Sequence, residues 1–105
     1  MGAIKSVLKE ELANSLQMQQ NYERELKRLP KGSLIKKKVK EHEYYYLVLR
    51  EKSKVKFVYR GKVSEGEIKK FKEAKELRAK YRNLRSQVKK QVRFLRRVLR
   101  GKNSI

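Results

Sequence analysis

Alternation of apolar and polar side chains with a period of two marks the middle of this chain as a small β-sheet. Three segments, LIKKKV, EYYYLVLR and KVKFVYR, alternate in this way between residues 34 and 60. Polar turns near residues 41–42 and 51–53 separate them. We therefore predict a three-stranded antiparallel meander, which needs another element packed on its apolar face because a single small sheet is marginally stable.

Apolar residues at helical spacing lie on both sides of this sheet. Residues 4–29 carry an apolar stripe made of Ile4, Leu8, Leu12, Leu16, Tyr22, Leu26 and Leu29. Pro30 ends this first helix, and Ser64 with Glu67 three residues later is a capping-box signature for a second helix at about residues 65–100. Its stripe has the spacing of a coiled coil and consists of Leu77, Tyr81, Leu84, Val88, Val92, Leu95 and Leu99.

These elements predict one α+β domain over residues 1–105. We expect a long, antiparallel, coiled-coil-like helical hairpin with the three-stranded meander inserted between its two helices. A short tail at residues 101–105 follows the second helix.

Sorting each strand by parity gives one apolar set and one basic, aromatic set. The apolar set is the expected core face and consists of Ile35, Val39, Tyr45, Leu47, Leu49, Val55, Phe57 and Tyr59. The other set consists of Lys36, Lys38, Tyr44, Tyr46, Val48, Arg50, Lys54, Lys56, Val58 and Arg60. Because this second set contains no acid, we expect its face to meet a polyanion.

The net charge supports an anionic partner. The chain has 31 Lys and Arg against 11 acidic residues, all of them Glu, and a formal net charge of +20. Self-repulsion at this charge favours a neutralising partner such as nucleic acid. Without Cys or clustered carboxylates, and with His42 alone between two glutamates, the sequence predicts no enzyme, no metal and no cofactor. It contains no apolar run of membrane-spanning length and no signal-peptide core, so we expect a cytoplasmic, nucleoid- or ribonucleoprotein-associated protein.

A row of cations adjoins the apolar stripe of the second helix. Its members each follow a stripe residue, and they are Arg78, Arg82, Arg85, Lys89, Arg93, Arg96 and Arg100. At 100° per residue they share one sector and span about 33 Å, close to the roughly 34 Å of one duplex turn. A solvated helix usually mixes signs, whereas Arg78 to Lys102 contains no acid, which favours phosphate contact over charge kept only for solubility.

The tyrosines have two possible roles, packing within the protein and contact with nucleic acid. Tyr44 and Tyr46 either pack across strands or offer a platform for base stacking, or for sugar and methyl contacts in a groove. The cations beside them favour nucleic acid. Tyr45 belongs to the core set, and Tyr22 and Tyr81 to the helix stripes.

Short motifs in the sheet carry a resemblance. LPKGSL at residues 29–34, YYYL at 44–47 with Arg50, and YRGK at 59–62 resemble a module of small uncharacterised prokaryotic, mobile-element-associated proteins. The chain differs from that pattern at Lys52-Ser53, where a glycine-containing turn is usual. The strand–strand–strand–helix order is also similar to the arm-site DNA-binding domains of phage-type integrases. That likeness implies a sheet face inserted into the major groove.

The leading hypothesis is a non-enzymatic nucleic-acid-binding protein, with duplex DNA favoured over RNA. Its site combines the cation row with sheet residues Lys36, Lys38, Tyr44, Tyr46, Arg50, Lys56 and Arg60. One alternative is a phage- or element-encoded adaptor or inhibitor of a larger nucleic-acid-processing complex, with Phe94 and Val98 as its contact or as a homodimer seam. Another is an RNA-binding ribonucleoprotein component. The absence of a large aromatic and Leu-rich helix face argues against membrane-surface binding.

Overall fold

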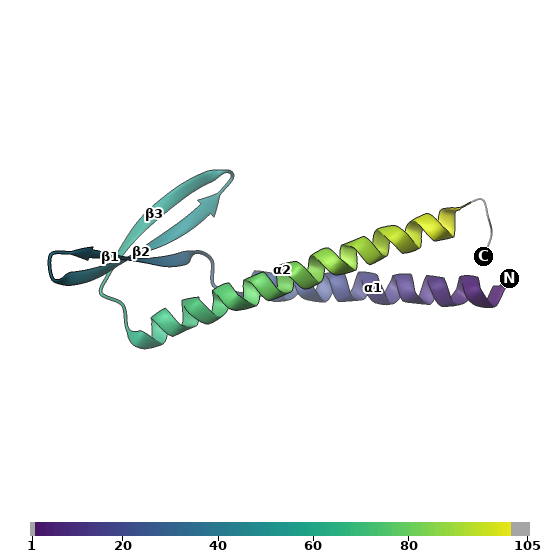
Figure 1. The fold of residues 1–105 in the computed structure, drawn as a ribbon, viewed down its shortest axis with the longest axis horizontal. Coiled ribbons are helices and arrows are strands. Elements are labelled where there is room, and N and C mark those ends of the chain that lie inside the picture. Colours follow the sequence, from purple (N-terminus) through teal and green to yellow (C-terminus); the bar gives the residue numbers. More distant parts are fainter. Residues whose placement is uncertain (1, 102–105) are drawn as a thin grey trace. The chain divides into compact units, whose positions relative to one another are not determined.

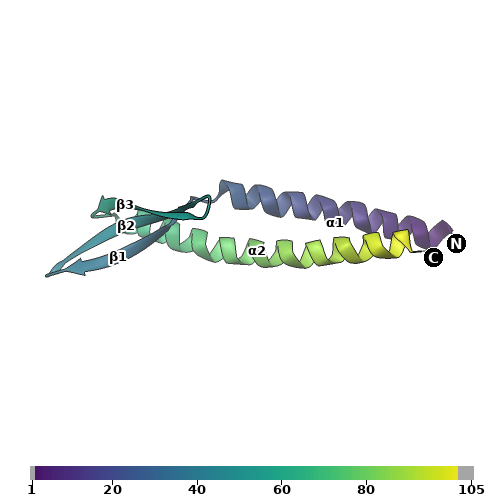
Figure 2. The same ribbon diagram turned by 90° about the horizontal axis from the view of Figure 1, so that it is seen from above.

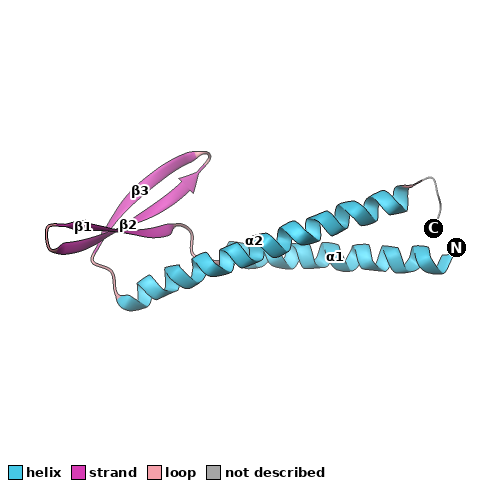
Figure 3. Cartoon of the chain, in the orientation of Figure 1, coloured by secondary structure: helices cyan, strands magenta, loops and turns pink. Residues whose placement is uncertain are grey.

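A computed structural model describes residues 2–101, and it confirms the α+β layout of two long helices with a three-stranded antiparallel sheet inserted between them (Figure 1, Figure 3). The elements in chain order are α1 (Gly2–Arg28), β1 (Ser33–Val39), β2 (His42–Glu51), β3 (Lys54–Gly61) and α2 (Glu65–Arg100). The chain forms two compact units, one made of α1 with the part of α2 from Ala79, the other of Leu29–Arg78. Apart from Gly101, the expected tail lies outside the described residues.

The helical unit is an antiparallel hairpin. In two perpendicular views, α1 and the later turns of α2 run side by side (Figure 1, Figure 2). The rings of Tyr22 and Tyr81 lie 6.1 Å apart between the helices, which agrees with the packing role expected for both. The residues buried in this unit are Ser15, Val88, Val92 and Leu95.

Ser15 is a buried member of the α1 seam that the apolar stripe did not include. It is 1% exposed, and it lies three residues after Leu12 and four before Gln19, at helical spacing. Since Tyr22 faces Tyr81 in an antiparallel pair, Ser15 lies near the level of Val88, which is 5% exposed. A small side chain at this level allows a bulky one from the other helix to be covered.

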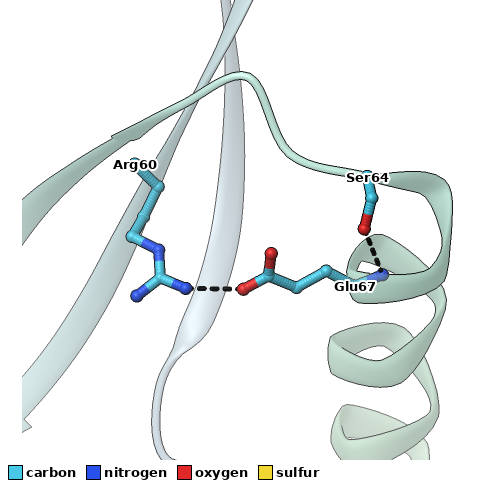
Figure 4. A network of polar contacts seen from close by, with 3 residues as sticks. All are labelled: Arg60, Ser64 and Glu67. Carbon is cyan, nitrogen blue, oxygen red and sulfur yellow. Dashed lines mark hydrogen bonds and ion pairs between the residues drawn. The ribbon is translucent and has the colours of Figure 1, made fainter.

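Local signals in the sequence set the ends of the helices. Helix α1 ends two residues before Pro30, which cannot donate the next backbone hydrogen bond. At the start of α2, the Glu67 amide donates to Ser64 Oγ at 3.2 Å, as the capping box predicts (Figure 4). The Glu67 carboxylate pairs with the Arg60 guanidinium at 2.5 Å, so the end of β3 is tied to the first turn of α2.

The sheet has the order β1-β2-β3 and two tight turns. Val39 pairs with His42 around a Lys40-Glu41 turn, and Glu51 pairs with Lys54 around a Lys52-Ser53 turn. Lys52 and Ser53 both have positive φ, 46° and 70°, the pattern of a type I′ hairpin turn. These non-glycine residues therefore hold backbone conformations that glycine and asparagine adopt more easily.

Gly32 fills a position in the chain before β1 that no other residue fits without strain. Its φ is +94°, and a Cβ there would lie 2.8 Å from the Val48 carbonyl oxygen and 2.9 Å from side-chain carbons of Leu47 and Leu49. The LPKGSL segment thus passes directly against the middle of β2, and this close approach requires glycine.

Candidate nucleic-acid interface

The strand register defines which side chains share a face of the sheet. Directly paired residues of antiparallel strands project to the same side. Ile35 pairs with Tyr46 and Tyr46 with Tyr59, whereas Leu34 pairs with Leu47 and Leu47 with Val58. The tyrosine face therefore consists of Ser33, Ile35, Lys37, Val39, His42, Tyr44, Tyr46, Val48, Arg50, Val55, Phe57 and Tyr59. The leucine face consists of Leu34, Lys36, Lys38, Glu43, Tyr45, Leu47, Leu49, Glu51, Lys54, Lys56 and Val58.

The expected basic, aromatic face is wrong as a single surface. Tyr44, Tyr46 and Arg50 lie on the tyrosine face, but Lys36, Lys38 and Lys56 lie on the leucine face. The cause is the turn length: a two-residue turn pairs residue 39 with 42 and residue 51 with 54, so odd positions share a face with even ones across each turn. Sorting every strand by the same parity therefore combined side chains that point in opposite directions.

Exposure of the side chains shows which face is covered. On the leucine face Leu47 is 9% exposed, which confirms its core assignment, whereas Tyr45 and Leu49 are half-buried. The core assignment is wrong for the exposed side chains Ile35, Val39, Val55, Phe57 and Tyr59. All five belong to the tyrosine face, which is the open side of the sheet.

Aromatic rings cluster on this open face around Tyr59. The ring of Tyr59 lies 5.3 Å from that of Tyr46 and 6.2 Å from that of Tyr44. His42 continues the cluster at 6.2 Å from Tyr44, and Lys37 Nζ lies 5.3 Å from the centre of the Tyr46 ring. These spacings are those of favourable edge-on and tilted aromatic pairs and of a cation–π contact.

No acid accompanies the cations Lys37 and Arg50 on the tyrosine face. On the leucine face, by contrast, Lys36 Nζ lies 3.4 Å from a Glu43 carboxylate oxygen. Both of these side chains are about half exposed, with 53% and 51% of their surface accessible, so the pair contributes little to stability. The two faces therefore differ in burial and in the presence of acids, which occur only on the leucine face.

Arg60 occupies an irregular position. Tyr59 pairs with Tyr46 while Gly61 pairs with Tyr45, so Arg60 is the extra residue of a β-bulge. Its ion pair with Glu67 directs the guanidinium toward α2 (Figure 4). Arg60 therefore does not belong to the tyrosine face.

Arg78 differs from the rest of the cation row. It belongs to the Leu29–Arg78 unit, is half-buried, and donates a hydrogen bond to the Pro30 carbonyl oxygen. The other six cations lie in the helical unit and form no ion pair among residues 2–101; they are Arg82, Arg85, Lys89, Arg93, Arg96 and Arg100. Arg85 and Lys89 are half-buried and the remaining four are exposed. These six residues are called the α2 cation row from here on.

Residues 2–101 contain no group of His, Cys, Asp or Glu side chains placed to hold a metal ion. Neither helix combines the length and the apolar character needed to cross a membrane.

Lys37, Phe57 and Tyr59 are members of the open face that sequence reasoning did not identify as site residues. Lys37 belongs to neither parity set and Phe57 and Tyr59 to the core set, whereas the register places all three on the face of Tyr44 and Tyr46. The two-residue turn length, which fixes the pairing parity, is the signal in the sequence that identifies them.

Fold and surface together define a strongly basic α+β protein whose sheet carries an open aromatic face. Residues 4–70 match the model of a family described as a domain of unknown function, DUF6788, and the chain belongs to this family. The matched region contains α1 from residue 4, the whole sheet and the first six residues of α2, whereas the α2 cation row lies beyond it. Comparison with curated proteins and with solved structures gives no match.

Proposed function

We propose that this protein binds nucleic acid without catalysing a reaction, and that the α2 cation row contacts the phosphates. The observation that carries the proposal is the row itself. Its six cations occupy one sector of a continuous helix from Arg82 to Arg100, a span of about 27 Å at 1.5 Å per residue. No acid interrupts them. Repulsion within such a row weakens the helix unless an anion lies along it, and five of the six are Arg, which binds phosphate through paired N–H groups.

The corrected register changes the preferred target. The strand–helix order and the mobile-element likeness favour duplex DNA through a sheet face inserted into a groove, but Lys36, Lys38 and Lys56 do not lie beside the tyrosines on such a face. The proposal therefore concerns nucleic acid in general. Direct competition between duplex DNA, duplex RNA and single strands identifies the preferred form.

Salt dependence tests the phosphate contacts. If all six cations neutralise phosphates, log K should fall with log salt at a slope of about −5 on duplex and about −4 on single strands. Replacing Arg93 and Arg96 by Gln should make the duplex slope less negative by about 2. A matched control removes two exposed cations of α1, Lys9 and Arg24, and should leave the slope unchanged. A slope near zero, or equal effects of the two double variants, would overturn the proposal.

A second candidate is an adaptor or inhibitor that docks on a larger nucleic-acid-processing complex. The observation that favours it is Phe94, a large apolar side chain that is 55% exposed on α2. Under this alternative, the protein would bind nucleic acid no more tightly than an unstructured polycation of equal charge. Phe94→Ala would then reduce co-purification of the protein partner and leave nucleic-acid affinity unchanged.

A further inference from the structure

The tyrosine face exposes two large aromatic side chains to water. Phe57 and Tyr59 are each 59% exposed, and they lie two residues apart on β3, so their side chains leave the same face about 7 Å apart. Ile35, Val39 and Val55 are exposed on the same face, and a contiguous exposed apolar patch is typical of a binding site.

Neighbouring side chains hold the central ring in position. Tyr44 and Tyr46 project from β2 on the same face, and their rings flank Tyr59 at 6.2 and 5.3 Å. Both flanking rings are half-buried, whereas Tyr59 is exposed. The arrangement restricts the rotation of Tyr59 while leaving its ring accessible, so less side-chain entropy is lost when a flat ligand stacks on it.

The charges of this face point to the chemistry of its ligand. It carries Lys37 and Arg50 and no acid, so a fitting ligand combines flat aromatic surfaces with negative charge. A second copy of the chain fits poorly, because pairing two such faces would bring four cations together without a neutralising carboxylate. Nucleic acid has the required combination of aromatic bases and phosphates.

The geometry of base stacking indicates whether the ligand is single-stranded or duplex nucleic acid. In a duplex the base faces are stacked on one another and only their edges are accessible from the grooves, so an aromatic platform has little to contact. Unpaired bases can be splayed apart and stacked on exposed rings. In known sheet-based RNA-binding domains, aromatic side chains of the sheet stack two or three bases in this way.

We infer that the tyrosine face binds single-stranded nucleic acid by stacking unpaired bases on Tyr59 and Phe57. Tyr44 and Tyr46 support the central ring, and Lys37 and Arg50 pair with the adjacent phosphates. The inference rests on the proposed function, but it specifies a different property: the unpaired base, not the phosphate, is what the sheet recognises.

A binding experiment on the full chain separates the two claims. Three labelled ligands of about 12 nucleotides are compared by fluorescence anisotropy: a single strand, its duplex, and an abasic strand with the same phosphates but no bases. We expect the single strand to bind about tenfold or more tightly than the abasic strand, and to quench the tyrosine emission. Equal affinity for the two would overturn the inference even if both bind well. Binding of none of the three would instead overturn the proposed function.

Paired variants locate the stacking. Phe57→Ala with Tyr59→Ala should lower single-strand affinity by about 10- to 100-fold while abasic-strand affinity stays constant. The conservative pair Phe57→Tyr and Tyr59→Phe should retain the affinity, because the rings remain. Val39→Ala with Val55→Ala removes exposed apolar surface from the same face without removing rings, and should change affinity less than threefold. Equal losses of single-strand affinity in the ring and valine variants would contradict stacking. If a variant unfolds, the comparison of single and abasic strands on the unaltered protein still tests the inference.

Discussion

The rings of Tyr46 and Tyr59 face each other across neighbouring strands, with centroids 5.3 Å apart and planes inclined at 64°. The two residues are directly paired in the register of β2 and β3. Tyr44 approaches the same ring of Tyr59 from the next position on that face of β2, at 6.2 Å. Tyr59 is therefore the centre of the aromatic cluster, although it lies on β3, an edge strand of the sheet.

The Tyr46–Tyr59 contact should be measurable as a coupling free energy. Edge-on aromatic pairs contribute about 0.5–1.5 kcal/mol beyond the area they bury. In a double-mutant cycle with Tyr46→Ala and Tyr59→Ala, we expect a coupling near 0.5 kcal/mol, at the low end because Tyr59 is exposed. Urea unfolding of the four proteins measures it. Additive single effects would show that the rings do not interact in solution.

Much of the fold follows from local patterns in the sequence. Pro30 and the Ser64–Glu67 capping pair place the helix ends within two residues of their observed positions, and α2 spans the predicted residues 65–100. Ser15 escaped notice because a polar residue contributes nothing to an apolar stripe, even where its small size is what allows the helices to pack.

The sheet faces were harder to predict because they depend on pairing between strands. Alternation within one strand is a local property, whereas the parity that two strands share depends on the number of residues in the turn. Glu51 and Lys54 flank a two-residue turn, so Phe57 and Tyr59 join the face of Tyr46 and not that of Leu47. The bulge at Arg60 adds a shift that no alternation pattern reveals.

Adjacent lysines on β1 provide a direct test of the corrected faces. Lys37 Nζ lies against the Tyr46 ring on the open face, whereas Lys36 projects to the other side and pairs with Glu43. Lys37→Gln should therefore weaken single-strand binding by about three- to tenfold, since its phosphate contact is lost. Lys36→Gln removes the same charge and should have less than half that effect on log Kd. A larger effect of Lys36→Gln would contradict the assigned register.

The glycine before β1 should tolerate no substitution. Gly32→Ala places a Cβ 2.8 Å from the Val48 carbonyl oxygen at a φ of +94°. We expect a loss of about 3 kcal/mol or more in the free energy of unfolding, from backbone strain and overpacking together. Gly66→Ala is the matched control, because its Cβ would meet nothing within 4 Å and it lies in a helix, where alanine is favoured. Thermal unfolding followed by circular dichroism compares the two variants, and similar Tm values would refute this account of Gly32.

The β2–β3 turn should become more stable when its residues suit its backbone. Lys52 and Ser53 both hold positive φ, which costs a non-glycine residue about 1–2 kcal/mol. Replacing them with Asn and Gly, the preferred type I′ pair, should raise the free energy of unfolding by about 1 kcal/mol. The same replacement at Lys40-Glu41 serves as a control, since only Lys40 has positive φ there and a smaller gain is expected. An equal or larger gain at the Lys40-Glu41 turn would contradict the assignment.

Arg78 and Arg82 occupy successive positions of the expected helix row, yet they should respond in opposite ways to the same change. Arg78 is half-buried and donates to the Pro30 carbonyl oxygen, so Arg78→Gln should lower the free energy of unfolding by about 1–2 kcal/mol. Arg82 is exposed and unpaired within residues 2–101, so Arg82→Gln should change stability by less than about 0.5 kcal/mol.

In binding, the order reverses: Arg82→Gln should reduce the magnitude of the salt slope on duplex by about 0.9, and Arg78→Gln should leave it nearly constant. Urea unfolding and salt-dependent anisotropy on the same two variants give four values, and equal salt slopes would show that Arg78 contacts phosphate as well.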